Sequence, residues 1–439
     1  MVVNEAAKVI GAVPVVVTVS DGTDTDSQTL TVTVTNVPEN APPTDLALDN
    51  ATIAENSGAD AVVGRFILTD PWVFGDPETI TEGVGEKVWE FNSESGGQMW
   101  GEPALGPDGT LYIGSDDGKV YAVDAESGSK EWEFDTGIAV TSSAAVGTDG
   151  TVYIAANNGR VYALDGSDGT KAWEFDSGDT SAMAPSPPAI GIDGTIYIGS
   201  GGWDGKLYAL NGSTGVKKWE FAMNSKVASP AVGSDGTVYA GAGDGKMYAL
   251  NGSDGTQIWE FDTGKELWTS PAIGSDGTVY VSANPAGETG FVYALDGGSG
   301  SKIWEFKPAG QVWASPVIGS GGTLYIGSSD HKVHALDGSD GSKKWEFETG
   351  GAVNYSAAIG FDGTVYIAAI DIVYALDEAD GAKKWELRTW QELSSPVIDA
   401  GGRVHFRLAN GSLWALQGSS GPARSPWPMQ GQNAQRTAR

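Results

Sequence analysis

Short apolar runs separated by Gly, Asp and Ser recur along most of the chain. The unit that begins at Trp219 shows the pattern, because ASPAVG, GTVYA, GKMYALN and TQIWEF follow one another with turns such as Ser234-Asp235-Gly236 between them. Runs of five to seven residues bounded by turn residues predict β-strands. No long run has helical periodicity, so we expect four short antiparallel strands per unit and little helix.

A Trp-Glu pair marks the phase of this repeat and recurs every 40 to 46 residues. The pairs begin at Trp89, Trp132, Trp173, Trp219, Trp259, Trp304, Trp345 and Trp385. A period of about 40–50 residues with several strands per unit is typical of a β-propeller. The pattern therefore predicts an all-β fold.

Residue size indicates where each strand lies in a blade. The first run is built from small residues, as in Ser229-Pro230-Ala231, which suits the crowded centre of a ring and an edge strand that tolerates Pro. The fourth run carries the Trp, which fills the wider gap at the rim. The second and third runs are apolar on both faces, so each blade is expected to lie between two others.

Counting the runs predicts how the ring closes. Each type of run occurs eight times, yet Trp89 precedes every first run and no Trp-Glu run follows Gln417. We therefore expect an eight-bladed β-propeller of four-stranded antiparallel blades. Its last blade would take three strands from Ser394–Gln417 and the fourth from Val88–Phe91, which removes the open edge.

The chain divides into four parts on this interpretation. Residues 88–417 form the propeller, residues 71–87 a connector, and residues 418–439 a Pro/Gly/Ser-rich tail. Residues 1–70 predict a β segment, beginning with a hairpin of Pro14–Val19 and Thr29–Val34. Glu5 precedes the first apolar run in place of a basic cluster, so the start predicts β-structure rather than a signal peptide.

Composition excludes several kinds of chemistry. The net charge of -31 argues against nucleic acid and anionic lipid as partners, since both need a basic surface. Without cysteine there is no disulfide, thiolate metal site or catalytic thiol. No apolar run reaches the ~20 residues that span a membrane. His331 and His334 would point to opposite faces of one strand, and we expect His334 to replace a packed Tyr rather than bind metal.

The repeat resembles the PQQ-like (pyrroloquinoline-quinone-type) propeller repeat, with its S-P-A, D-G-T-V-Y-I-G-S, D-G-K-V-Y-A-L-D and S-G-x-K-x-W segments. The resemblance implies eight blades and an exported protein. Some members of that family are quinone-dependent dehydrogenases, whereas others, including periplasmic outer-membrane assembly factors, bind proteins and no cofactor. This chain lacks the adjacent cysteines and long loops of the dehydrogenases, so we expect no enzyme activity and no required cofactor. The tail also resembles a W-P-M…N-x-Q-R-T-G-R segment of such proteins, with Ala438 in place of Gly.

The first 70 residues resemble a junction between two cadherin-like repeats, through LTVTVTNV, the linker ENAPP, TIAENSGADAVVGRF and Thr69-Asp70-Pro71. The resemblance implies a calcium site made by Glu39, Asn40, Glu55 and Asp70, whose oxygens suit this hard cation. Trp72 stands where the family has a second Asp. The alternative is that these residues are plain acidic turn residues. The incomplete repeats would also expose strand edges that can pair with another copy of the chain.

Three tryptophans occupy one repeat position that opens the innermost strand, at a mouth of the channel. They are Trp100, Trp268 and Trp313, and the other units carry Thr141, Pro185, Val227, Asn354 and Leu393 there. An aromatic patch of this kind suits a peptide or a glycan. The alternative is that the indoles only plug the channel. Trp203 and Trp390 are further candidates for exposed aromatic residues.

The sequence thus favours a non-catalytic propeller at the cell surface, outside the cell or in the periplasm. Its expected partners are proteins, including other copies of itself, and it would act as a rigid scaffold. A quinone (PQQ)-dependent dehydrogenase and a glycan-binding propeller are the alternatives.

Overall fold

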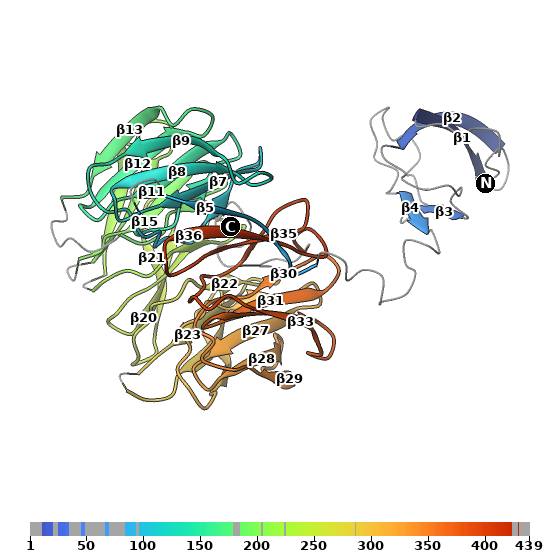
Figure 1. Cartoon of the computed structure of the whole chain (residues 1–439). Helices are drawn as coiled ribbons and strands as arrows, with labels where there is room; N and C mark the ends of the chain where they lie inside the picture. Colours follow the sequence, from blue (N-terminus) through green and yellow to red (C-terminus); the bar gives the residue numbers. More distant parts are fainter. Residues whose placement is uncertain are drawn as a thin grey trace. The chain divides into compact units, whose positions relative to one another are not determined.

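The computed structural model describes residues 84–423 except 94–95, 179–184, 203–204, 224 and 286, together with Met429 and the backbone of four N-terminal strands. The chain forms two units, Met1–Glu82 and Gly83–Arg439 (Figure 1). In the first unit β1 (Gly11–Ser20) pairs with β2 (Thr25–Val34), and β3 (Asp45–Leu48) pairs with β4 (Phe66–Thr69). The predicted N-terminal hairpin is therefore present.

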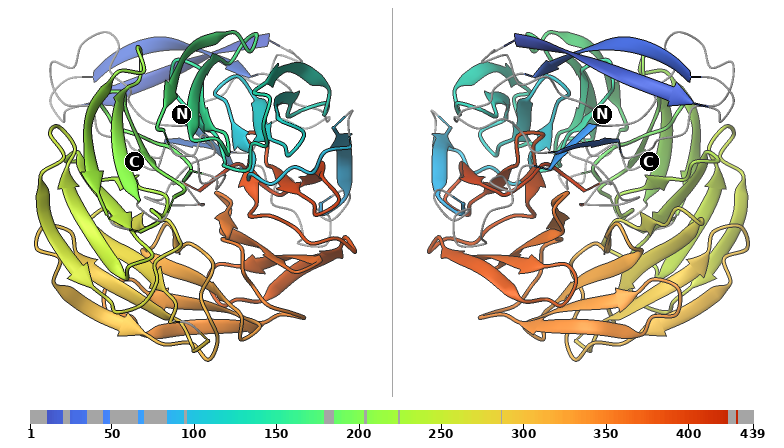
Figure 2. Two further views of the ribbon diagram at one scale, coloured as in Figure 1. Left: turned by 90° about the vertical axis from the view of Figure 1, so that its left-hand side faces the viewer. Right: turned by 90° about the vertical axis from the view of Figure 1, so that its right-hand side faces the viewer.

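Eight four-stranded antiparallel sheets make up the second unit, and its described residues contain no helix. Figure 2 shows these blades arranged around a central axis. Blade 1 contains β6 (Ala104–Leu105), β7 (Thr110–Gly114), β8 (Lys119–Asp124) and β9 (Lys130–Asp135). Blade 2 contains β10 (Ala145–Val146), β11 (Thr151–Ala155), β12 (Arg160–Asp165) and β13 (Lys171–Asp176). Blade 3 contains β14 (Ala189–Ile190), β15 (Thr195–Gly199), β16 (Lys206–Asn211) and β17 (Lys217–Ala222). Blade 4 contains β18 (Ala231–Val232), β19 (Thr237–Gly241), β20 (Lys246–Asn251) and β21 (Gln257–Asp262).

The remaining blades repeat this order until the last one. Blade 5 contains β22 (Ala272–Ile273), β23 (Thr278–Ala283), β24 (Phe291–Asp296) and β25 (Lys302–Phe306). Blade 6 contains β26 (Val317–Ile318), β27 (Thr323–Ser328), β28 (Lys332–Asp337) and β29 (Lys343–Glu348). Blade 7 contains β30 (Ala358–Ile359), β31 (Thr364–Ala369), β32 (Ile372–Asp377) and β33 (Lys383–Arg388). Blade 8 contains β34 (Val397–Ile398), β35 (Arg403–Arg407), β36 (Ser412–Gln417) and β5 (Lys87–Asn92).

Burial follows the order that residue size predicts. The innermost strands are two buried residues each, and the second strands are almost wholly buried, as in β19 and β23. The fourth strands alternate between exposed and buried side chains, and their Trp is the buried residue, as Trp259 is in β21. The core of the propeller is therefore the set of interfaces between neighbouring blades.

The ring closes as predicted, because β5 is the fourth strand of blade 8. It pairs antiparallel with β36 and places Trp89 opposite Ala415. Closure extends into the preceding turn, where Gly85 N donates to Gln417 O at 2.7 Å and Gln417 N donates to Glu86 O at 2.9 Å. The two ends of the repeat array thus share one turn as well as one sheet.

The start of the C-terminal tail lies against blade 7. Ala423 N donates to Ile359 O and Phe361 N donates to Gly421 O, both at 2.7 Å, and Met429 forms a further bridge with Ala358. The strand that they follow, β30, pairs with β31 on its other side, so the tail occupies the edge that faces the channel. The tail arginines that we expected to dock on the propeller, Arg424, Arg436 and Arg439, lie outside the described residues.

Candidate interaction surface at one end of the propeller

Each seam between blades is held by one carbonyl that accepts two aromatic donors. In the first seam Trp132 Nε1 donates to Gly166 O at 2.7 Å, and Tyr112 OH donates to the same oxygen at 3.1 Å. Gly169, at a φ of 73°, packs so closely on Trp132 that a Cβ would collide with the indole. The same tryptophan bond joins Trp89 to Ala125, Trp173 to Gly212, Trp219 to Gly252, Trp259 to Gly297, Trp304 to Gly338 and Trp345 to Glu378.

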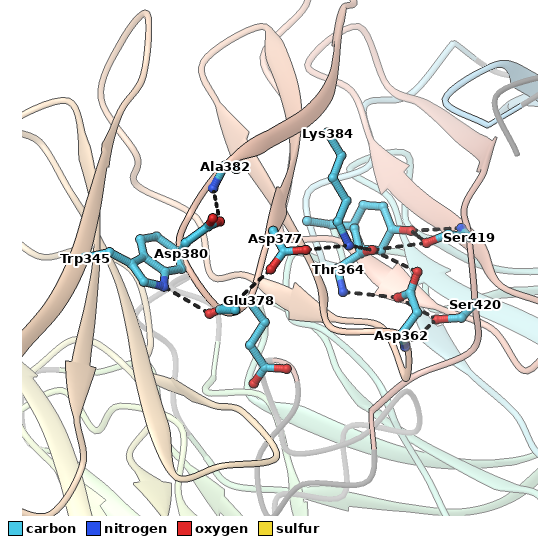
Figure 3. A network of polar contacts seen from close by, with 12 residues as sticks. Trp345, Asp362, Thr364, Asp377, Glu378, Asp380, Ala382, Lys384, Ser419 and Ser420 are labelled. Carbon is cyan, nitrogen blue, oxygen red and sulfur yellow. Dashed lines mark hydrogen bonds and ion pairs between the residues drawn. The ribbon is translucent and has the colours of Figure 1, made fainter. Parts of the chain in front are cut away.

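The seam between blades 7 and 8 carries an additional polar network (Figure 3). Ser420 Oγ donates to Asp362 Oδ1 at 2.9 Å, and Lys384 Nζ donates to Thr364 Oγ1 at 2.9 Å (Figure 3). Ser419 N donates to Tyr366 OH at 2.9 Å. Hydrogen bonds from these hydroxyls outweigh the effect of burial and lower the pKa of Asp362. Every group in this network has a structural partner, so we assign it to closure of the ring.

The two ends of the propeller carry different connections. Since the four strands of a blade alternate in direction, the loops from each fourth strand to the next blade and the turns between second and third strands share one end. Trp100, Trp268, Trp313 and Trp390 all belong to these loops, and we call this end the tryptophan end. The opposite end presents exposed Ile192, Val216 and Phe361 on its turns.

The tryptophans predicted to form a patch lie at this end but do not form a single cluster. Trp268 and Trp313 belong to consecutive blades, 5 and 6, whereas Trp100 belongs to blade 1 on another part of the ring. Trp100 is 50% exposed and Trp313 is 41% exposed. Trp100 Nε1 donates to Asp116 Oδ2 at 3.3 Å, and Trp268 Nε1 donates to Glu266 Oε2 at 3.0 Å.

Two residues that the repeat alignment placed beside these tryptophans have another role. Val227 and Leu393 are buried and do not share the exposed position of Trp100. Val227 packs on Gly199 of the previous blade as Leu267 packs on Gly241. The sequence alignment was therefore wrong by one residue in these two loops, because contact with the previous blade, and not distance from the Pro, sets the position.

Sequence reasoning gave Trp390 too little weight. This residue is 74% exposed and has a φ of 60°, a conformation that costs a non-glycine residue about 1–3 kcal/mol. Two other blades have glycine here, Gly137 at a φ of 74° and Gly264 at 62°. The signal in the sequence was a Thr-Trp pair after the fourth strand, where several units have Thr-Gly or Ser-Gly.

A second exposed apolar residue lies close to Trp390. Ile370 is 48% exposed with a φ of 53°, and it occupies the turn between β31 and β32. The Trp390 loop binds this turn, since Thr389 N donates to Asp371 O at 2.7 Å and Leu393 N donates to Ile370 O at 3.1 Å. Two strained backbones thus hold apolar side chains in solvent on one loop pair.

The histidines are packing residues. His334 is buried, its Nε2 lies 3.0 Å from Asp330 Oδ2, and its ring packs edge-on against Phe306. Tyr248 makes the same bond to Asp244 two blades away, as expected if His334 replaces a Tyr. His405 is buried beside Trp89, with its Nε2 3.1 Å from Asp399 Oδ2.

The predicted calcium ligands Glu39, Asn40, Glu55 and Asp70 lie outside the described residues, and the calcium site stays a prediction. In the part of the chain that the structure describes, no group of three or more His, Asp or Glu side chains is placed to hold a metal ion. This part therefore offers no donor set that fits a calcium-bound quinone. It also holds no helix long and apolar enough to cross a membrane.

Closed rings of eight blades, each with an Nε1-bonded Trp seam, define the PQQ-like class of β-propellers. A family model described as outer membrane protein assembly factor BamB matches residues 78–227, 219–354 and 288–437. The chain belongs to this family. The match begins at residue 78, and the cadherin-like resemblance of residues 1–70 has no support from the comparisons.

Solved structures share this fold at low sequence identity. BamB from Moraxella catarrhalis matches with a TM-score of 0.62 and 18% identity, over 76% of this chain and 99% of that one. The computationally designed Ika8 protein matches with a TM-score of 0.64 and 17% identity, over 76% and 100%. Quinohemoprotein alcohol dehydrogenase from Comamonas testosteroni matches with a TM-score of 0.61 and 15% identity, over 77% and 78%. No curated protein sequence matches the chain.

Proposed function

We propose that the chain is a non-catalytic, exported propeller that binds another protein through its tryptophan end. The observation that carries the proposal is Trp390, a large apolar side chain held in solvent on a backbone that favours glycine. Such strain persists only where the rest of the fold enforces it, and it is concentrated at functional sites. Tryptophan is also enriched among the residues that dominate protein interfaces.

Membership of the BamB family supports this proposal and its placement in the periplasm or at the outer membrane. A position on the outer cell surface is part of the proposal. The absence of cysteine in the sequence and the lack of a fitting donor set in the described residues favour binding over quinone chemistry.

Site-specific photo-crosslinking in the producing cells tests the proposal. A photoreactive phenylalanine analogue replaces Trp390 in one variant and Phe361, exposed at the opposite end, in the control. We expect a crosslinked protein band from position 390 and none from position 361. Equal bands from both positions, or no band from position 390, would contradict the proposal.

A glycan-binding propeller is a second candidate, favoured by Trp268 and Trp313 on consecutive blades. Exposed indoles on neighbouring loops can stack on sugar rings. Replacing both residues by Ala should remove binding to a glycan array, and Trp100→Ala is the matched control. An unchanged array would dismiss this candidate.

The alternative of a quinone-dependent dehydrogenase has a direct test, since the fold is shared with a quinohemoprotein alcohol dehydrogenase. Pyrroloquinoline quinone and Ca²⁺ are added to the purified chain, and dye-linked oxidation of alcohols is measured. We expect neither a bound chromophore nor oxidation. Turnover above that of the free quinone would replace the binding proposal with an enzymatic one.

The N-terminal unit is proposed to link copies of the chain through its strand edges, with calcium at the predicted ligands. Deleting residues 1–70 should then convert an associating chain into a monomer in sedimentation experiments, and chelation by EDTA should weaken the association. A chain that is monomeric at high concentration with or without these residues would refute self-association.

A further inference from the structure

Arg407 is the one long side chain at a repeat position that is otherwise occupied by small residues. It is the second residue after the conserved ring of the second strand, His405 in blade 8. The equivalent residues are Gly114, Ala155, Gly199, Gly241, Ser282, Gly327 and Ala368. They are small because a buried residue of the following loop packs over them, as Val140 packs over Gly114. Arg407 is only 8% exposed, so its charge lies inside the seam between blades 8 and 1.

This guanidinium has no acidic partner. Arg407 Nε is buried without a hydrogen bond, and among the described residues no carboxylate oxygen forms an ion pair with it within 4.0 Å. The chain has 57 acidic and 26 basic residues, so a lone buried arginine is not explained by a shortage of carboxylates. Burial of a charge is costly unless it is paired and hydrogen-bonded.

The neighbouring acidic residues are engaged elsewhere. Glu392 Oε1 accepts a hydrogen bond from Tyr355 OH at 2.8 Å, and Glu102 Oε1 accepts one from Ser395 Oγ at 2.5 Å. Burial and the bond to Glu392 raise the pKa of Tyr355 to about 12, although Arg407 opposes the shift. The phenol therefore stays protonated and keeps Glu392 as its acceptor.

An exposed aromatic face lies beside the unpaired charge. The ring centroid of Trp100 is 6.0 Å from Arg407 Cζ, at the limit of a cation–π contact, and Trp100 is half exposed. The same surface continues to Trp390, because Glu392 lies two residues after it in one loop. A basic group, an aromatic face and a strained apolar side chain thus follow one another across blades 1, 8 and 7.

We infer that Arg407 and Trp100 form a carboxylate-binding site for an acidic segment of the protein partner, beside the apolar contact made by Trp390. The inference rests on the proposed function. The planar guanidinium suits a carboxylate, with which it forms two parallel hydrogen bonds. A protein segment is favoured over a small polycarboxylate because Trp390 and Ile370 offer apolar contacts on the adjoining loops.

Peptide arrays provide the test. Each peptide carries one apolar aromatic residue and one Asp or Glu at a varied spacing, and its twin carries Asn or Gln instead. The full chain and its Arg407→Met variant are applied to the array, with Arg160→Gln, an exposed arginine of blade 2, as the control. We expect the acidic peptides to bind the wild-type and control chains, and the amide twins and the Arg407→Met chain to show at least tenfold weaker binding. Trp100→Ala should weaken binding severalfold.

Other outcomes overturn the inference or assign another ligand. No preference for acidic peptides, or equal binding by Arg407→Met, overturns it. Free citrate and pyrroloquinoline quinone are measured in parallel, and binding of these alone would assign the site to a small polycarboxylate. Strong peptide binding only after residues 430–439 are removed would identify the chain's own C-terminus as the occupant, which contradicts an external partner.

Folding of the variant is controlled by its stability. Replacing an unpaired buried charge by Met should leave stability equal or higher. A destabilised Arg407→Met chain that still binds acidic peptides would show a purely structural role. If crosslinks at position 390 persist while Arg407→Met changes nothing, this inference fails and the proposed function stands. If crosslinks are absent while citrate binds, the proposed function fails instead.

Discussion

Blade 4 and blade 8 have the same backbone but fill their seams with different chemistry. In blade 4, Tyr239 OH and Trp259 Nε1 both donate to Gly297 O of the next blade. In blade 8 the Tyr is replaced by His405, which binds Asp399 of its own blade, and only Trp89 donates to the next blade. The regular seam therefore encodes the fold, whereas the departures gather where the ring closes and where we place the binding site.

The replacement of Tyr by His in blade 8 is a paired change. Regular blades have a glycine beneath the Tyr ring, as Gly233 lies under Tyr239, where a Cβ would be within 3.3 Å of the ring. Asp399 stands at the glycine position of blade 8 and leaves room only for a smaller ring. Blade 8 thus exchanges a contact with its neighbour for a buried polar pair within itself.

Removing the closing strand should have the largest effect on this comparison. A chain that begins at Ser93 lacks β5, and so it loses the burial of Trp89 and Phe91 and leaves the edge of β36 open. Two buried aromatic residues represent on the order of 5–10 kcal/mol, comparable with the whole stability of a domain. We expect loss of cooperative unfolding in urea.

The matched control for this truncation begins at Gly83 and keeps β5 together with the shared turn at Gly85. It should unfold like the full chain, because the first unit ends at Glu82. Cooperative unfolding of the shorter chain at the same urea concentration would show that closure does not stabilise the ring.

A regular seam should be the next most sensitive feature. Trp259→Ala removes a buried indole and its bond to Gly297 O, which should cost about 3–5 kcal/mol in the free energy of unfolding. Trp100→Ala, at an exposed indole, should change it by less than about 0.5 kcal/mol. Urea titration of both variants measures the difference. Similar losses in the two variants would mean that the repeated Trp does not hold the seam.

The polar pair in blade 8 should make the protein sensitive to acid. Burial lowers the pKa of His405 below 6.5, outweighing Asp399, and the nearby Arg403 acts in the same direction as burial. The unfolded chain therefore binds the proton more readily, so stability is complete above pH 6.5 and falls as the pH drops toward the lowered value. The loss is up to about 1.4 kcal/mol per pH unit.

Asp399 adds a loss of the same sign at lower pH. Burial raises its pKa, but the bonds from His405 and Arg403 prevail and lower it below 3.8. The double variant with His405→Tyr and Asp399→Gly restores the regular residues and should flatten the stability curve between pH 6.5 and 5. Urea titrations across this range measure it, and an equally steep curve in the double variant would contradict the assignment.

Much of the fold was predictable because one seam is repeated along the chain. The spacing of Trp-Glu pairs predicted the blades, and the missing last pair predicted that Val88–Phe91 would complete blade 8. The carbonyl acceptors of the tryptophans were not predictable, since any backbone oxygen looks the same in a sequence. The positions of Val227 and Leu393 were misjudged because packing on the previous blade decides them.

The candidate site was harder to predict than the fold for the same reason. Trp390 stands out only when its backbone is known to require the conformation that glycine favours in other blades. Arg407 is one arginine among many until its burial and lack of a partner are seen. Functional departures from a repeat are thus visible in the sequence as substitutions, but their direction and exposure come from the structure.

The smallest predicted effect separates stability from function at the tryptophan end. Trp390→Gly should raise the free energy of unfolding by about 1 kcal/mol, because glycine adopts a φ of 60° without strain. Trp313→Gly, at a residue with no positive φ, should not stabilise the chain and serves as the matched control. Thermal unfolding measures both variants, and binding to the partner found by crosslinking is measured in parallel. A stabilised Trp390→Gly chain that has lost its partner would show that the strain is maintained for binding, whereas a stabilised chain that binds as before would remove Trp390 from the interface.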